Sequence, residues 1–246
     1  MNVAIFYFSG TGNTRMTADT YADLFRRAGH QVTTSSMEDC DQVGECDLIL
    51  IGGPIYAGNM PDYVIQWVRK TVPPSQGTKA IIFTTSAGLA NAHGVRSIGK
   101  KLVRKGYRVI DTQTYEMPRN FYIDKYAPTP KEEQRQQLTR MISQVGESLT
   151  NLKETGEMTF PENVLGIDLL ADVFRIMAKS MGHNFHIDDS CVGCGKCEKN
   201  CPKANIRHAE KRYGSSCMMC TRCIHGCPVN AISYKGKKIE QYKVGT

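Results

Sequence analysis

The sequence has no apolar run that approaches the roughly 18 residues a membrane-spanning helix needs. Its first ten residues carry no basic lead-in and no small-residue cleavage site, so no secretory signal peptide is expected there. Cysteine is nearly absent before residue 191, where only Cys40 and Cys46 occur. These absences favour a cytoplasmic protein and give no support to a disulfide-linked secreted fold.

Strand-like and helix-like segments alternate along the first 153 residues. Apolar runs predict strands at 3–8, 31–35, 47–51, 79–84 and 107–114, and helical spacing predicts helices at 13–28, 60–70, 93–105 and 131–153. Gly29 is expected to end the first helix, and Met60-Pro61 to begin the second. This alternation predicts an α/β domain with a doubly wound, five-stranded parallel sheet over residues 1–153.

A less regular stretch follows at residues 154–186. Apolar side chains from Asp168 to Met181 recur at roughly helical spacing, which predicts a helix there. A linker helix that packs one domain against the other is the favoured interpretation, and a helix that docks a partner is the alternative.

Eight of the ten cysteines lie between residues 191 and 227, in two runs of the same form. Each run reads Cys-x2-Cys-x2-Cys-x3-Cys-Pro and is followed by Ile206 or Ile232 at a matching offset, which indicates an internal duplication. Residues 187–238 therefore resemble a two-cluster bacterial ferredoxin, whose fourth cysteine serves the other cluster. The resemblance implies one [4Fe–4S] cluster on Cys191, Cys194, Cys197 and Cys227, and a second on Cys217, Cys220, Cys223 and Cys201.

Other features of residues 187–246 fit a small α+β ferredoxin-like domain. Gly193 and Gly195 ease the tight turn around a cubane, and the two isoleucines would cover the clusters. Zinc on Cys-x2-Cys pairs is the alternative, but zinc modules rarely space three cysteines in this way twice over. His208 and His225 are not needed as ligands.

The formal charge of +7 is concentrated in this same region, where 11 Lys and Arg face 5 Asp and Glu. Ligation of two clusters by eight thiolates would lower the charge of the whole chain to about +3. The basic side chains then mostly offset sulfur charge, and no recognition motif accompanies them. Nucleic-acid binding is therefore not expected.

A loop rich in glycine and hydroxyl groups, Ser9 to Thr14, follows the first predicted strand. Backbone N–H groups at a helix N-terminus and several hydroxyls suit a phosphate dianion, although a plain tight turn is the alternative. The pattern Ser-x-Thr-Gly-x-Thr resembles the FMN phosphate loop of flavodoxins and lacks the Gly-Lys pair of a Walker loop.

The flavodoxin resemblance covers roughly residues 1–153 and implies two further loops beside the flavin ring. Tyr56 is expected to stack on the ring, with a core tyrosine as the alternative, and Gly58 to allow a carbonyl flip towards flavin N5. Trp67 is expected in the core rather than at the cofactor. The expected FMN-binding residues are Ser9, Thr11, Gly12, Asn13, Thr14, Pro54, Ile55, Tyr56, Ala57, Gly58, Asn59, Ser86, Ala87 and Gly88.

The whole chain resembles the flavodoxin–ferredoxin fusion proteins of anaerobes. The resemblance implies a relay of single electrons between two [4Fe–4S] clusters and FMN, exchanging with a redox protein partner. The alternative is an FMN-dependent reductase of a small molecule held under the aromatic segment 115–130, and a zinc-bearing regulatory protein is a third reading. The chain lacks the acidic surface of ordinary flavodoxins, so their partners are not carried over.

Overall fold

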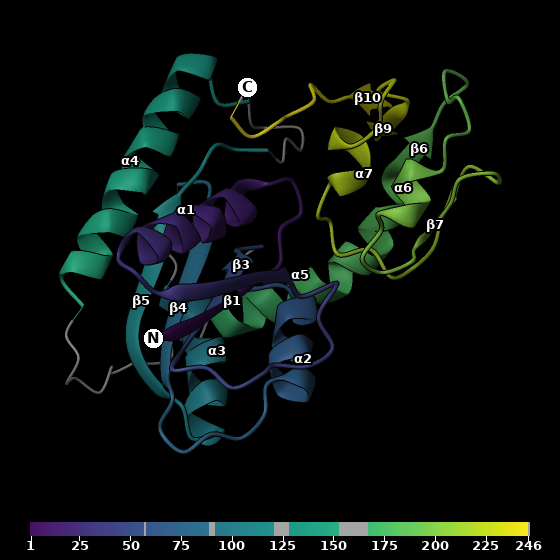
Figure 1. Cartoon of the computed structure of the whole chain (residues 1–246). Helices are drawn as coiled ribbons and strands as arrows, with labels where there is room; N and C mark the ends of the chain where they lie inside the picture. The colour runs from purple at the N-terminus through teal and green to yellow at the C-terminus, as the bar shows by residue number, and fades with distance from the viewer. Residues whose placement is uncertain (57, 89–91, 121–127, 153–166, 246) are drawn as a thin grey trace.

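The computed structural model describes residues 1–56, 58–88, 92–120, 128–152 and 167–245 (Figure 1). Its larger sheet has five parallel strands in the order β2-β1-β3-β4-β5. The strands are β1 (Asn2–Tyr7), β2 (Gln31–Ser36), β3 (Leu48–Pro54), β4 (Lys79–Ser86) and β5 (Arg108–Glu116). This order is that of the flavodoxin-like doubly wound fold, as predicted.

Helices cover both faces of this sheet because its strands bury side chains on both sides. One face carries α1 (Asn13–Arg27) and α4 (Lys131–Thr150), and the other carries α2 (Asp62–Thr71) and α3 (Ala92–Arg104). In β1, Val3 and Ile5 pack with α1 and α4, whereas Ala4 and Phe6 pack with α2 and α3. The alternation of side chains along each strand therefore builds two cores.

Several element boundaries differ from the sequence prediction by a few residues, and two of these differences have a clear structural cause. Helix α2 begins at Asp62 because Pro61 has extended backbone angles (φ −55°, ψ 146°) and precedes the helix as its N-cap residue. Strand β3 continues past Ile51 because residues 52–54 keep pairing with β4, with Pro54 opposite Thr85. Gly52 is required there, since a Cβ would lie 2.1 Å from Phe83 Cζ.

The predicted core position of Trp67 is confirmed. Its ring centroid lies 5.1 Å from that of Phe6, and its Nε1 donates a hydrogen bond of 2.9 Å to the Cys40 carbonyl oxygen. Cys40 and Cys46 are half-buried free thiols that pack against the same core.

Short elements make up the rest of the chain. After α5 (Ile167–Met181) come η1 (Gly182–Asn184), β6 (Phe185–Ile187), α6 (Lys196–Lys199), β7 (Ile206–Arg207), β8 (Arg212–Tyr213), α7 (Arg222–His225), β9 (Ile232–Tyr234) and β10 (Lys237–Lys238). Strands β10, β9 and β6 form an antiparallel sheet, and β7 pairs with β8. Their small core includes six half-buried cysteines.

Helix α5 confirms the helix predicted near residues 168–181 and runs between this C-terminal unit and the sheet (Figure 1). Ala178 is buried in the core of the C-terminal unit, whereas Ile176 and Met177 are 65% and 52% exposed. The preceding linker residues 153–166 lie outside the described residues. None of the described helices has the length and apolar character that a membrane span requires.

Candidate cofactor sites

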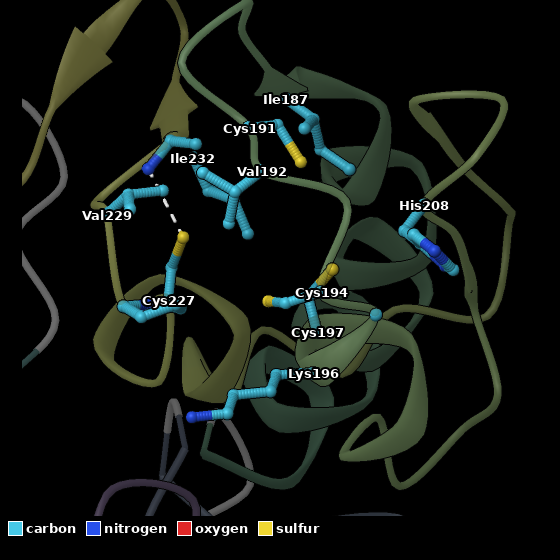
Figure 2. Close-up of a pocket in the computed structure, with 13 residues that line it drawn as sticks. Ile187, Cys191, Val192, Cys194, Lys196, Cys197, His208, Cys227, Val229 and Ile232 are labelled. Carbon is cyan, nitrogen blue, oxygen red and sulfur yellow. Dashed lines mark hydrogen bonds between the residues drawn. The ribbon is translucent and has the colours of Figure 1, made fainter.

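The eight clustered cysteines line two separate cavities of the C-terminal unit. The outer cavity is lined by Cys191, Cys194, Cys197 and Cys227 (Figure 2). The inner cavity is lined by Cys201, Cys217, Cys220 and Cys223. Each cavity therefore takes three cysteines from one run and the last cysteine from the other. Ile232 lines the outer cavity and Ile206 the inner one.

The backbone of the two runs repeats with an offset of 26 residues. Gly193 (φ +68°) and Gly195 (φ +67°) are matched by Met219 (φ +58°) and Thr221 (φ +55°). Ala204 (φ +46°) and Asn230 (φ +48°) form a third pair. A non-glycine residue in this left-handed region costs on the order of 1 kcal/mol. The second run keeps the same turns with non-glycine residues in spite of this cost, which indicates that the surrounding structure requires this backbone shape.

Backbone N–H groups are directed at the cysteine sulfurs. The Asn205 N–H donates to Cys201 Sγ at 3.3 Å, and the Ala231 N–H donates to Cys227 Sγ at 3.2 Å. Met219 makes a similar bond of 3.3 Å to Cys217 Sγ. Such donors stabilise sulfur in its negatively charged form, which is the form that binds metal.

Burial acts against that charged form when no cation is present. It raises the pKa of the Cys220 thiol to about 12 and also raises the pKa of Cys223. Among the described residues, no three His, Cys, Asp or Glu side chains converge closely enough to hold one metal ion. Zinc requires sulfurs about 2.3 Å from a single centre, whereas a cubane needs four sulfurs around a cavity. The four cysteines of each set line one cavity.

The loop from Ser9 to Thr14 joins β1 to α1 at the carboxyl edge of the sheet. Gly12 takes φ +108° directly before the helix. Ser9 Oγ accepts a 3.1 Å bond from the Gly12 N–H, and Thr11 Oγ1 accepts one from Asn120 Nδ2. Thr14 Oγ1 lies 2.7 Å from Thr85 Oγ1. A hydroxyl that accepts one bond keeps its own proton, so Ser9 and Thr11 can still donate to a phosphate at the N-terminus of α1.

Asn13 is buried and is held by its own chain. Its Nδ2 donates to the Pro118 carbonyl at 3.0 Å, and its Oδ1 accepts from Tyr242 Oη at 2.5 Å. A Cβ at Gly12 would lie 2.6 Å from Val244 Cγ1. The C-terminal segment therefore covers the predicted phosphate loop, and Asn13 positions that loop.

The other two predicted flavin loops begin at the ends of β3 and β4, beside the phosphate loop. The Ile55 N–H donates to the Thr85 carbonyl at 2.9 Å, and Tyr56 and Asn59 exchange backbone hydrogen bonds. Gly58 and Gly88 take positive φ angles of +94° and +87°. Pro54 and Ser86 are the last residues of their strands, Ala87 is exposed, and Ala57 lies outside the described residues.

Tyr56 lies between the phosphate loop and the inner cavity. A Cβ placed on Gly10 would be 2.6 Å from Tyr56 Oη and 2.8 Å from the Cys220 carbonyl oxygen. Burial, followed by the nearby Cys220 sulfur, raises the pKa of Tyr56 well above its ordinary value. Its hydroxyl therefore stays neutral where the two candidate sites meet.

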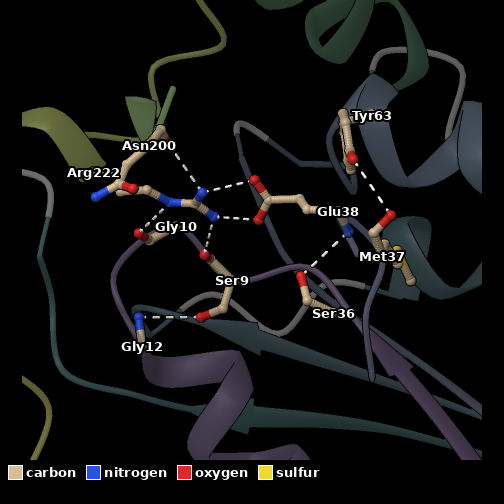
Figure 3. Close-up of polar contacts among 9 residues, drawn as sticks. All are labelled: Ser9, Gly10, Gly12, Ser36, Met37, Glu38, Tyr63, Asn200 and Arg222. Atoms are coloured by element: carbon tan, nitrogen blue, oxygen red, sulfur yellow. Dashed lines mark hydrogen bonds and ion pairs between the residues drawn. The ribbon is translucent and has the colours of Figure 1, made fainter. Parts of the chain in front are cut away.

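Arg222 joins the inner cavity to the flavin loops (Figure 3). Its guanidinium donates to both Glu38 oxygens at 2.7 and 2.6 Å and to the carbonyls of Ser9 and Gly10 at 2.7 and 3.2 Å. Burial lowers the pKa of Arg222, but the Glu38 bonds more than offset this and the pKa is raised. The inner cavity is thereby fixed against the phosphate loop.

Two known family models match separate parts of the chain. A flavodoxin domain model matches residues 4–119, and a 4Fe–4S binding domain model matches residues 185–207. The chain is a flavodoxin–ferredoxin fusion. The flavodoxin domain implies FMN and the matched motif implies an iron–sulfur cluster, so the fusion protein is an electron-transfer iron–sulfur flavoprotein.

Solved structures with some likeness to the fusion protein include three flavodoxins. An archaeal flavodoxin is 17% identical, covers 61% of this chain and 100% of its own, and has a TM-score of 0.42. The Megasphaera elsdenii flavodoxin is 23% identical, covers 58% of this chain and 98% of its own, and has a TM-score of 0.42. The flavodoxin of Streptococcus pneumonia TIGR4 is 18% identical, covers 60% of this chain and 99% of its own, and has a TM-score of 0.41. A search of curated proteins finds no match.

Several residues at this junction of the fusion protein were not identified from the sequence. They are Glu38, Asn120, Arg222, His225 and Tyr242. Arg222 alone carried a signal, because it occupies the position of Lys196 in the second cysteine run. His225 lies at the same junction, where its Nδ1 accepts from the Tyr242 N–H at 3.0 Å and its Nε2 donates to the Asn120 carbonyl at 2.6 Å.

Proposed function

We propose that the fusion protein relays single electrons between two [4Fe–4S] clusters and FMN, and exchanges them with a redox protein partner. The observation that carries this proposal is the division of eight cysteines between two cavities, of which the inner one lies against the phosphate loop. The cluster ligands are those two sets of four. The proposed domains are 1–153, a linker at 154–186, and 187–246.

The chain's own residues perform the binding steps of this relay. Ser9, Thr11 and Thr14 hold the flavin phosphate, while the loops 54–59 and 86–88 flank the ring. FMN supplies the exchange between a two-electron and a one-electron couple. Arg222 and Tyr56 keep the inner cavity beside the flavin loops, so that a partner is not needed for the internal step.

An anaerobic visible spectrum with iron and flavin quantitation tests the proposal. We expect about eight iron atoms and one FMN per chain, since each cubane has four irons. A colourless protein that holds zinc without iron or flavin would contradict it.

The variant Cys191→Ala is expected to lose about half of the iron and to keep its FMN. Loss of both cofactors would contradict a two-module organisation.

A second candidate, an FMN-dependent reductase of a small molecule, is favoured by one pocket. A space of about 350 Å³ lies between α2, α5 and the inner cysteine loop. Tyr56, Tyr63, Phe174, Lys179 and Met218 are among its lining residues. Residues 121–127 of the aromatic segment 115–130 lie outside the described residues. Reoxidation of the reduced protein by small molecules without any partner would favour the reductase.

A further inference from the structure

The two cysteine runs have the same internal geometry and different surroundings. In the inner run, Met218 packs against the flavodoxin core, Arg222 binds Glu38, and His225 is buried against Asn120 and Tyr242. Cys220 is half-buried beside Gly10. Four positions of this run therefore form the contact with the flavodoxin domain.

The equivalent positions of the outer run, 26 residues earlier, are Val192, Cys194, Lys196 and Lys199. All four are exposed, and Val192 is exposed over 64% of its surface. Val229 lies at the rim of the same cavity and is 40% exposed. Figure 2 shows Val192, Val229 and Lys196 around the outer cavity. These five residues are called the outer patch.

The outer patch carries positive charge that the C-terminal unit does not neutralise. Three carboxylates of the C-terminal unit are already paired with other side chains: Asp188 with Lys238, Asp189 with Lys211, and Glu198 with His208. Within the part of the chain that the structure describes, neither Lys196 nor Lys199 has a side-chain ion pair. Arg222, the counterpart of Lys196, shows what such a residue does when it is docked, because it holds the Glu38 carboxylate and two backbone carbonyls of the flavodoxin domain.

We propose that the outer patch is the docking surface for a second redox protein whose cofactor is bordered by carboxylates, and that electrons enter or leave the chain there. This inference rests on the proposed function. The partner would contact the outer run in the way that the flavodoxin domain contacts the inner run. An acidic side chain of the partner would pair with Lys196, as Glu38 pairs with Arg222. One electron leaves the partner's cofactor and enters the group held at the outer cavity, and no bond is made or broken.

The charge complementarity favours an acidic protein over a second copy of this chain. The surface of a second copy that would match the outer patch is its flavodoxin face with Glu38, and that face is already covered by the copy's own inner run. Long-range attraction between opposite charges raises association rates and weakens with ionic strength. The rate of electron exchange with the partner should therefore depend on the patch lysines and on salt.

The test uses the intact, cofactor-loaded protein and an acidic flavodoxin in its hydroquinone form as the donor, which is oxidised by one electron to the semiquinone. The variant Lys196→Glu/Lys199→Glu is compared with Lys70→Glu/Lys100→Glu, which changes the same charge on exposed lysines of α2 and α3. Stopped-flow absorbance gives the second-order rate constant. We expect a loss of tenfold or more for the patch variant, and less than twofold for the control.

A small uncharged donor, photoreduced 5-deazariboflavin, separates docking from damage to the cofactors. It should reduce the wild type and the patch variant equally, and both should contain the same iron and FMN. An unchanged rate with the acidic flavodoxin, or an equal loss with both donors, would overturn the docking surface. A dimer that the patch substitutions dissociate in analytical ultracentrifugation would overturn it in favour of a second copy. Absence of iron in the wild type would instead count against the proposed function itself.

Discussion

Strands β1, β3 and β4 bury large aliphatic side chains on both faces of the flavodoxin sheet, whereas the unit after Met181 has half-buried cysteines around its small core. Ile49, Leu50 and Ile81 are fully buried, and they need no cofactor to remain so. The C-terminal unit instead surrounds two cavities with sulfur. The first region is therefore stabilised by apolar burial, and we expect the stability of the second to depend on what its cysteines bind.

Removal of iron should give the largest difference in amide protection between the two regions. Chelation under oxidising conditions is expected to abolish amide protection across residues 185–240, because the buried thiols lose the cations that hold them in place. The sheet of residues 2–116 should keep its protection, since its core contains no ligand cysteine. Hydrogen exchange followed by mass spectrometry measures both regions in one sample.

A protein kept anaerobic with its iron is the control for this comparison. If the C-terminal unit keeps native protection after the iron is gone, its fold does not depend on the clusters. If the sheet loses protection as well, the two regions form one cooperative unit.

The phosphate loop gives the next largest expected effect. Thr11→Ala with Thr14→Ala should weaken FMN binding by about 2–4 kcal/mol, because each hydroxyl is expected to donate a bond to a charged phosphate. Flavin fluorescence on titration of the apoprotein measures the change. Thr20→Ala is the matched control, since its hydroxyl bonds the Met16 carbonyl further along the same helix. Equal affinity in the double variant would place the phosphate elsewhere.

Much of this organisation could be predicted from the sequence because its determinants are local. The apolar runs predicted all five strands of the larger sheet. The resemblance to a two-cluster ferredoxin implied two sets of four cysteines, and each set lines one cavity. Boundaries were wrong where pairing overrides local preference, as in Gly52 to Pro54, which continue β3 by pairing with β4.

The contacts between the two regions could not be predicted. Arg222 and Glu38 are 184 residues apart in sequence, and Tyr242 and Asn13 are 229 apart. No periodicity or spacing relates such residues. Their meeting depends on how the C-terminal unit is placed against the carboxyl edge of the sheet, which is a property of the whole fold.

The Arg222–Glu38 pair is where the two regions can be loosened without removal of either cofactor. Arg222→Lys keeps the charge but loses the two-point hold on Glu38, and should cost about 1–3 kcal/mol of docking. Amide exchange at Gly10 to Gly12 should then accelerate by roughly 5- to 150-fold. Arg212→Lys, on the exposed pair with Glu210, is the control and should leave these amides unchanged. A similar effect of both variants would show that Arg222 does not hold the junction.

Substitution of Trp67 should give the smallest effect. It tests whether the α2 side of the sheet contributes only to stability and takes no part in cofactor binding. Trp67→Phe removes the hydrogen bond to the Cys40 carbonyl and keeps an aromatic ring beside Phe6, so a loss of about 1–2 kcal/mol in unfolding free energy is expected. FMN affinity and the iron content should stay within error of the wild type, because the ring packs in the core between α2 and the sheet and contacts neither candidate site. Denaturant unfolding of the FMN-loaded protein measures the first quantity, and flavin titration the second. A loss of FMN affinity without a loss of stability would mean that this side of the sheet takes part in cofactor binding.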